Sequence, residues 1–429
     1  MRINTKSNFR GDAPKFEKAC VLQGESLVAL TRTLAFVSLI VFAGCGSHVP
    51  EFKDNELFIL RIEKESGGTL GTAREDVRAC LNSLFGTPDN PKSPEALDGS
   101  WRLDMEKVGR AAGAVGRAQD GVERGLWRKH CATCHGISGD GAGPTAALQA
   151  PYPRDFRRGS FKFKSTPIGS RPTHADFVRI IENGIQGTAM PGFQSLTRTK
   201  FFEKDIDALA EYVMYLSIRG EVERKLLTQA GLELDDSERV FDASLGASDP
   251  RYESQQKRIQ AVVSEVLQPW SFAETKVTPV SVTLPNDLQS SIERGKQLFN
   301  SETTACASCH GPEGKGNGKS QDFDEWTKDW TIRAGIDPLK REEWKPMKKL
   351  GALKPVKNPP RNFHLGAFRG GSNPSDIYLR IVNGIEGTPM PAVAKQPENR
   401  QGLTEPQIWD VVNFVLSLND NSARNEEAK

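Results

Sequence analysis

The chain has 429 residues, of which 57 are Lys or Arg and 55 are Asp or Glu, so its formal net charge is only +2. A chain of this length predicts two or three domains, and the near balance of charge gives no case for nucleic acid as a partner. Apolar residues make up 37% of the sequence, which is enough to build the cores of small folded domains.

The first 45 residues are typical of a targeting segment. A polar, mostly basic stretch leads into the apolar run Leu34 to Gly44, which is too short to span a bilayer comfortably but suits the central region of a signal peptide. The run ends in Phe42-Ala43-Gly44-Cys45, a pattern similar to a bacterial lipobox, so we predict that Cys45 is lipidated and becomes the mature N-terminus. The alternative is an uncleaved apolar anchor. Both place the rest of the chain on the periplasmic side of a bacterial membrane, held there by a lipid or an apolar segment.

Residues 46–116 form an N-terminal extension. It carries one apolar run with the character of a strand, Leu57 to Ile62, followed by helical charge patterns on either side of a turn near Pro88. We expect Cys80, in this segment, to be a buried free thiol rather than half of a disulfide.

Four sequence blocks then occur twice in the same order, which predicts two homologous domains. The blocks are 131–143 (CATCHGISGDGAG) with 306–318 (CASCHGPEGKGNG), 153–156 (PRDF) with 360–363 (PRNF), 179–191 with 380–391, and a closing amphipathic helix in each copy around residues 206–216 and 408–418.

Two segments lie outside the repeated blocks, one between the two copies and one within the second copy. The segment 220–287 between them is charged and helical, with an apolar stripe from Ile259 to Leu267 that we expect to pack on a neighbouring domain. The second copy also holds an extra tract, Asp324 to Leu353, with three tryptophans. This tract either is a surface loop that covers the edge of the functional site of the second copy, or forms a docking surface for a partner.

The first block predicts covalent attachment of haem c. Two thiols three residues apart lie on one face of a helix and can reach both vinyl groups on one side of a porphyrin, and the adjacent histidine then binds the iron. A zinc site would need four protein ligands, and each motif offers three. The predicted attachment residues are Cys131 and Cys134 for one haem and Cys306 and Cys309 for the other, with His135 and His310 as iron ligands.

Met190 and Met390 are the predicted sixth ligands of the two irons. Each follows a Gly-Thr pair and precedes a proline, in a loop where a methionine is poorly placed to fill a core. A thioether is a soft ligand that favours Fe(II) and raises the reduction potential. His174 and His364 have no histidine counterpart in the opposite copy, and we interpret both as surface residues.

Arginines recur in the second block, where Arg154 and Arg361 each precede an aromatic residue by two positions. A planar guanidinium suits a carboxylate, so these residues either bind haem propionates or form structural salt bridges. Further cations follow in the first copy, and they form either a solvated face or a surface that guides an acidic partner. They are Arg157, Arg158, Lys162, Lys164 and Arg171.

At these residues the chain resembles two tandem class I cytochrome c domains. The resemblance implies an all-α fold, in which a small helical domain wraps each haem and the axial pairs are His135 with Met190 and His310 with Met390. It also implies that the carbonyl of Pro144 orients the proximal histidine, a proline that Lys319 replaces in the second copy. The predicted organisation is a signal peptide (1–45), an extension (46–116), cytochrome c domain 1 (117–219), a helical linker (220–287), cytochrome c domain 2 (288–420) and a disordered tail (421–429).

Together with the lipobox, the resemblance implies a membrane-anchored di-haem cytochrome that exchanges electrons with redox partner proteins. We expect a carrier or an electron-transfer subunit of a respiratory chain, free or fixed to a larger dehydrogenase or oxidase, rather than an enzyme acting alone. Two six-coordinate irons would leave no open position for a substrate. The alternative is a di-haem peroxidase that reduces hydrogen peroxide, which would need two unlike haems and a distal acid or base.

Overall fold

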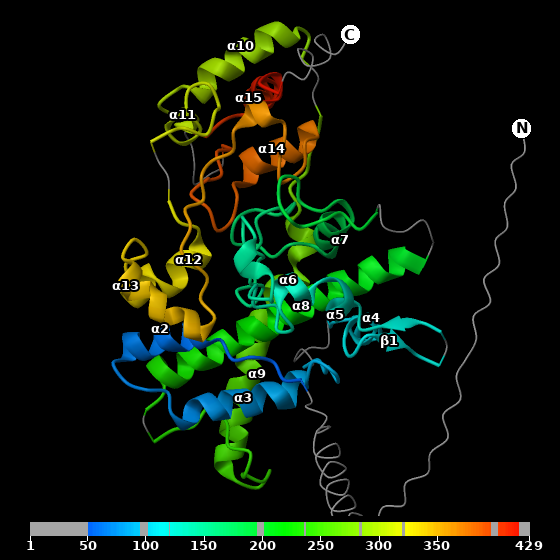
Figure 1. Cartoon of the computed structure of the whole chain (residues 1–429), viewed down its shortest axis with the longest axis vertical. Helices are drawn as coiled ribbons and strands as arrows, with labels where there is room; N and C mark the ends of the chain where they lie inside the picture. Colours follow the sequence, from blue (N-terminus) through cyan, green and yellow to red (C-terminus); the bar gives the residue numbers. More distant parts are fainter. Residues whose placement is uncertain are drawn as a thin grey trace, which may run out of the picture. The chain divides into compact units, whose positions relative to one another are not determined.

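The computed structural model describes residues 50–94, 102–119, 121–194, 201–235, 237–282, 285–319, 322–395 and 402–419. The predicted lipidation residue Cys45 and the predicted disordered tail lie outside these ranges. The regular secondary structure of the described residues is almost entirely helical, which confirms the all-α prediction; the strands among them, β1 (Gly116–Arg117) and β2 (Glu123–Arg124), pair as a short antiparallel hairpin (Figure 1). None of the described helices is both long and apolar enough to cross a membrane.

The helices follow the chain in two groups. From the N-terminal extension to the linker they are α2 (Glu56–Ser66), α3 (Thr72–Phe85), α4 (Met105–Ala111), α5 (Leu126–His130), α6 (Ala132–His135), α7 (His174–Asn183), α8 (Phe201–Thr228) and α9 (Pro250–Ser271). The second group comprises α10 (Leu288–Phe299), α11 (Cys306–His310), α12 (Glu325–Trp330), α13 (Arg341–Trp344), α14 (Pro374–Asn383) and α15 (Glu405–Ser417).

The run Leu57 to Ile62, predicted as a strand, lies in helix α2 instead. Phe58, Ile59 and Ile62 are buried, and their spacing puts them on one face of the helix. The helix ends at Gly67, whose left-handed φ of 73° lets its N–H donate to the Glu63 carbonyl. The prediction was wrong because a short apolar run does not by itself distinguish a strand from a buried helix.

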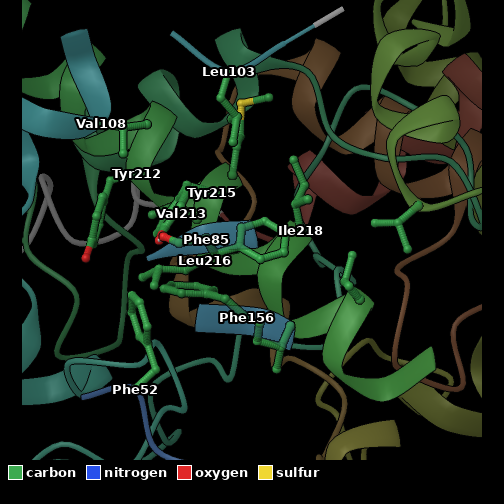
Figure 2. Packing of buried hydrophobic residues seen from close by; sticks show 14 of the residues in the cluster. Phe52, Phe85, Leu103, Val108, Phe156, Tyr212, Val213, Tyr215, Leu216 and Ile218 are labelled. Carbon is green, nitrogen blue, oxygen red and sulfur yellow. The ribbon is translucent and has the colours of Figure 1, made fainter. Parts of the chain in front are cut away.

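Helix α8 is the central element of the first half. Residues 208–223 of this helix are all buried, and Tyr212, Tyr215 and Ile218 are at most 1% exposed, so this stretch is covered around its whole circumference by other elements. Helices α3, α4, α7 and α9 pack against it. Figure 2 shows aromatic residues of the extension and of the second repeated block gathered around its tyrosines. The N-terminal extension therefore shares one core with the first repeat copy.

The linker stripe packs as predicted. Its members, Ile259, Val262, Val263, Val266 and Leu267, are at most 4% exposed, and α9 contacts α8.

The second copy has a separate core in which α10 crosses α15. The crossing is close because of Gly295: a Cβ at this position would lie 2.0 Å from the Asp410 carbonyl oxygen. Phe299, one turn later, is 2% exposed and its ring centroid lies 5.3 Å from that of Phe414. In the first copy Trp127 contacts Tyr212 in the equivalent way, with centroids 5.5 Å apart.

The extra tract of the second copy packs against the first half of the chain. Trp344 is buried in a small core with Ala334 and Ile336, and Leu60 of α2 packs against it. Helix α12, at the start of the tract, also contacts α2. The described residues of this tract therefore pack against the N-terminal extension of the same chain. Neither the predicted surface loop nor the predicted docking surface for a partner anticipated this packing.

Candidate haem sites

The two cysteine motifs form one-turn helices, α6 and α11, and the glycines that follow fold the chain back against them. In the first copy Gly141 N–H donates to the His135 carbonyl and Gly143 N–H to the Cys134 carbonyl, at 3.0 and 3.1 Å. A Cβ on Gly143 would lie 2.5 Å from the Thr133 carbonyl oxygen, so the close approach requires glycine.

The second copy repeats this arrangement. Gly316 N–H donates to the His310 carbonyl and Gly318 N–H to the Cys309 carbonyl, at 2.8 and 3.1 Å. In both motifs the cysteines are free thiols rather than disulfides, so each pair is available to form thioethers.

The imidazole of His135 is held on two sides. Its Nδ1–H donates to the Arg154 carbonyl oxygen at 3.1 Å, and its ring stacks on Phe156 with centroids 4.7 Å apart. Burial lowers the pKa of His135 more than the Arg154 carbonyl raises it, which favours the neutral ring. With Nδ1 protonated and bonded to a carbonyl, the lone pair is on Nε2, where a metal ligand needs it.

The predicted role of Pro144 is wrong. The loop that contains Pro144 is hydrogen-bonded to the motif helix, because Thr145 N–H donates to the Thr133 carbonyl. The carbonyl that accepts the hydrogen bond from His135 belongs instead to Arg154, in the second repeated block. The replacement of this proline by Lys319 therefore removes no support from His310.

His310 has a matching environment. Its ring stacks on Phe363 with centroids 4.7 Å apart, and burial lowers its pKa while the Arg361 backbone opposes that shift. The geometry at Nδ1 does not reach a hydrogen bond, however, and this buried atom has no partner among the described residues.

The methionine loops have the same backbone geometry in both copies. Ile185 N–H donates to the Met190 carbonyl at 3.1 Å, and Met190 N–H donates to the Thr188 hydroxyl at 3.1 Å. The corresponding bonds at Met390 are 3.1 Å from Ile385 and 3.2 Å to the hydroxyl of Thr388. The threonine of the Gly-Thr pair thus fixes the main chain at the methionine.

Each methionine packs against the same core as the first cysteine of its own motif. Met190 and Cys131 line the core of the first half, and Met390 and Cys306 line that of the second. Each half of the structure therefore holds two thiols, a half-buried imidazole with a lowered pKa and a thioether, and the first thiol and the thioether pack against the same core. This donor set fits a covalently bound c-type haem with two axial ligands.

The two arginines of the second block form no ion pair within the described residues, so the predicted structural salt bridge is not found there. Burial lowers the pKa of Arg154 to about 10, and its guanidinium carbon lies 3.1 Å from the centroid of the Trp326 ring. Arg361 donates to the Ala367 carbonyl at 2.8 Å, while its buried Nε has no partner in the described chain. In each half, a half-buried arginine without an ion pair in the described chain thus lies on the segment whose backbone contacts the proximal histidine, and its guanidinium suits a propionate carboxylate.

The neighbouring cations do not form the solvated face or guiding surface that we predicted as alternatives. Each has an acidic partner within the chain: Arg157 pairs with Asp155, Arg158 with Glu325 and Asp329, Lys162 with Asp324, Lys164 with Glu386, and Arg171 with Glu221. Most of these partners are distant in sequence, so the sequence did not reveal the pairing.

The remaining predicted residues lie apart from the two sites. The Nε2 atom of His174 lies 3.3 Å from Asp207 and 3.5 Å from Glu211 of α8, and exposed His364 lies 2.7 Å from the Glu313 carbonyl oxygen. Cys80 is buried and free, as predicted. The sequence shows Phe156, Phe363 and Trp326 but does not reveal their roles, which are stacking on the two histidines for the phenylalanines and contact between the halves for the tryptophan. The repeated spacing of PRDF and PRNF was a signal for the two phenylalanines.

Two family models match successive parts of the chain. The model of cytochrome c matches residues 292–419, and the model described as cytochrome C oxidase, cbb3-type, subunit III, matches residues 119–213. This chain is a tandem cytochrome c. Its cytochrome c domains imply covalently bound haem c with iron and haem-based electron transfer, and two matched regions fit a count of two haems.

The comparison with curated proteins gives no match to this tandem cytochrome c. Among solved structures it is similar to the Kuenenia stuttgartiensis reducing HAO-like protein complex Kustc0457/Kustc0458. The sequence identity is 26%, the match covers 71% of this chain and 99% of that one, and the TM-score is 0.42.

Proposed function

We propose that the chain carries two c-type haems, one in each half, and transfers electrons outside the cytoplasm as a carrier or as an electron-transfer subunit of a respiratory chain. The observation that carries the proposal is the same donor set in each half: two free thiols, a half-buried histidine with a lowered pKa, and a methionine that packs against the same core as the first cysteine. The family model matched by the first half is named for an oxidase subunit, which supports a role beside a larger oxidoreductase.

The residues divide into three roles. Cys131 and Cys134, and in the second half Cys306 and Cys309, would form the thioethers. His135 with Met190, and His310 with Met390, would supply the axial nitrogen and sulfur. Arg154 and Arg361 would neutralise propionates. Bound haem iron supplies the exchange of single electrons between Fe(II) and Fe(III), and the two protein ligands change little in this exchange because neither has to leave.

The chain's own contribution is to hold these ligands and exclude water. The Arg154 carbonyl keeps the Nδ1 proton on His135, which would leave the Nε2 lone pair free to bind the iron. Met190 and Met390 are partly buried against apolar cores, which would limit the access of water to the thioethers once haem is bound. A methionine ligand in apolar surroundings favours the reduced state and hence a high potential.

The alternative function is a di-haem peroxidase. It would require one haem to release its distal ligand, yet the two methionine loops have matching hydrogen bonds. We therefore propose electron transfer without substrate turnover by this chain alone. Steady-state assays with hydrogen peroxide and a reduced electron donor would contradict this if the purified protein turned over peroxide and lost that activity in Met190→Gly or Met390→Gly.

We further propose that the mature chain lies on the periplasmic side of a bacterial membrane, held by lipid on Cys45 or by an uncleaved apolar anchor. The support is the apolar run before Cys45 in the sequence. Mass analysis of the protein from detergent-solubilised membranes would distinguish the two anchors, and co-purification would show whether the redox partner is permanently attached.

The deciding experiment for the haem assignment combines intact mass with carbon monoxide titration. We expect a mass increase of two haems and no carbon monoxide binding to the reduced protein, because both irons have six ligands. Met390→Ala should bind one equivalent, and Met190→Ala should do the same. A parent protein without haem, or one that binds carbon monoxide stoichiometrically at neutral pH, would overturn the assignment.

A further inference from the structure

Trp326, at the start of the extra tract in the second copy, contacts both candidate haem sites. We propose that Trp326 is a positioning residue that anchors the Met390 loop of the second half on the segment that orients His135 in the first half. This inference rests on the proposed function and goes beyond it, because it makes the sixth ligand of one haem dependent on the opposite domain.

The first-half side of the contact involves two successive residues. The Arg154 carbonyl accepts the Nδ1–H of His135 at 3.1 Å, and the next carbonyl, of Asp155, accepts the indole N–H of Trp326 at 3.0 Å. The Arg154 guanidinium carbon lies 3.1 Å from the Trp326 ring centroid, within cation–π range. The tryptophan is thus bound to the backbone that orients the proximal histidine.

The second-half side involves Gly387, three residues before Met390. A Cβ on Gly387 would lie 2.1 Å from Cζ3 of Trp326, so the ring lies directly against the main chain of the methionine loop. The residue before the tryptophan adds a backbone bond, because Glu325 N–H donates to the Gly387 carbonyl at 3.1 Å.

Helix α12, which carries the tryptophan, is itself fixed to the first half. Arg158 donates to the Glu325 carbonyl at 2.8 Å, and Asp329 at the other end of the helix binds Arg224 of α8 at 2.8 Å. Because both ends of α12 are tied down, Trp326 cannot follow the Met390 loop freely, and it restrains that loop instead.

The restraint acts on one methionine only. The first copy has no counterpart of the extra tract, and a Cβ on Gly187, the equivalent of Gly387, would meet the end of the Arg361 side chain at 3.4 Å and the Ala367 Cβ at 3.7 Å, both ordinary contact distances. Both glycines have the same left-handed backbone, with φ of 68° and 74°. Gly187 is therefore a matched control for the tryptophan contact.

The test measures how firmly each methionine holds its iron. Methionine-ligated ferric haem has a weak absorption band in the red, and this band disappears at alkaline pH when a deprotonated amine replaces the thioether. In a Met190→His background the band reports Met390 alone, and in a Met390→His background it reports Met190 alone. The variants are Trp326→Leu, Trp326→Phe, Gly387→Ala and Gly187→Ala, with Trp344→Leu as a control that perturbs the core of the tract without reaching Gly387.

We expect Trp326→Leu and Gly387→Ala to lower the pH midpoint of the Met390 band by about one unit, a tenfold change in the exchange equilibrium. Trp326→Phe keeps the ring but loses the N–H donor, so its shift should be smaller. Trp344→Leu and Gly187→Ala should leave the Met390 midpoint unchanged, and Trp326→Leu should leave the Met190 midpoint unchanged.

Two results would overturn the inference while leaving the proposed function intact: two haems by mass with an unmoved Met390 midpoint in Trp326→Leu, or equal shifts at both methionines, which would indicate general loosening. A parent protein that carries no haem would overturn both the proposed function and this inference.

Discussion

Asp329 and Arg224 form a two-point ion pair between the extra tract and helix α8, with Nη1 2.8 Å from Oδ2 and Nη2 3.3 Å from Oδ1. Arg61 of α2 binds the same carboxylate at 2.8 Å, and Arg158 lies 3.6 Å away. Burial raises the pKa of Asp329, but the surrounding arginines lower it more, so its net shift is downward. One carboxylate thus joins the extension, both repeat copies and the central helix.

Replacing Asp329 by Asn should lower the free energy of unfolding by about 2–4 kcal/mol, because it leaves partly buried arginines without their counter-charge. Because the pKa of Asp329 is lower in the folded state than its ordinary value of 3.8, its ion pairs stabilise the fold fully at pH values above 3.8. This stabilisation is lost as the pH falls below 3.8. Chemical denaturation at pH 7 and at lower pH would measure both. Asp337→Asn is the matched control, because its pairing with Lys340 is exposed and 4.0 Å long, and it should change stability by less than about 0.5 kcal/mol.

Exchanging either methionine ligand for histidine should lower one of the two reduction potentials and leave the other nearly unchanged. Axial ligands set haem potentials over a range of about 0.8 V, and loss of the thioether should account for a decrease on the order of 0.1–0.3 V. Spectroelectrochemical titration of Met190→His and Met390→His would show which half has the higher potential. If neither substitution moved a potential, these methionines would not be ligands.

Glu221 of α8 should make the protein less stable as the pH rises from about 4.5 to 7. Burial raises its pKa to about 7, against the opposing effects of Arg171 and of the Trp270 N–H, which donates to it at 2.9 Å. The folded state therefore holds this proton over a range where the unfolded state, with a pKa near 4.5, has lost it. At about 1.4 kcal/mol per pH unit, the contribution that disappears by pH 7 is about 3 kcal/mol.

The prediction for Glu221 is checked with Glu221→Gln, which should flatten the decline in unfolding free energy between pH 4.5 and 7. Glu265→Gln is the control, because Glu265 is 66% exposed and pairs only at the surface. An unchanged pH profile in Glu221→Gln would show that Glu221 is ionised throughout.

Cys80 should resist alkylation in the native protein. Its side chain is 1% exposed, and burial raises the pKa of its thiol to about 12, so almost no thiolate forms at pH 8. Peptide mapping after iodoacetamide treatment should find it unmodified in buffer and fully modified in denaturant. Rapid labelling of Cys80 under native conditions would mean that α3 opens readily from α8.

The sequence predicted those site residues whose type and spacing are rarely found outside haem attachment and iron binding. A Cys-x-x-Cys-His motif that occurs twice, with two methionines in matching Gly/Pro loops, identifies its chemistry without knowledge of the fold. The all-α class followed from the resemblance to class I cytochrome c domains, and the packing of the α9 stripe followed from helical periodicity, since Ile259 to Leu267 could bury only one face.

The features that escaped prediction depend on contacts between residues far apart in the chain. The run Leu57 to Ile62 is compatible with either a strand or a helix, and its neighbours in the fold decide between them. The carbonyl that binds His135 belongs to Arg154, 19 residues later, rather than to the nearer Pro144. The partners of Trp326 lie 171 residues earlier and 61 residues later, at Asp155 and Gly387, so only the folded chain reveals that contact.

The shared core of the first half has a practical consequence for dissecting this protein. Residues from Phe52 to Phe85 contribute side chains to the same interior as Tyr215 and Leu216, so a fragment that begins just before Cys131 would expose a large apolar surface and should aggregate on expression. Among the described residues, the core of the second half draws on positions between Val280 and Leu418. A single-haem fragment for spectroscopy is therefore better taken from that portion, with the extra tract losing its contacts with Leu60 and Arg224.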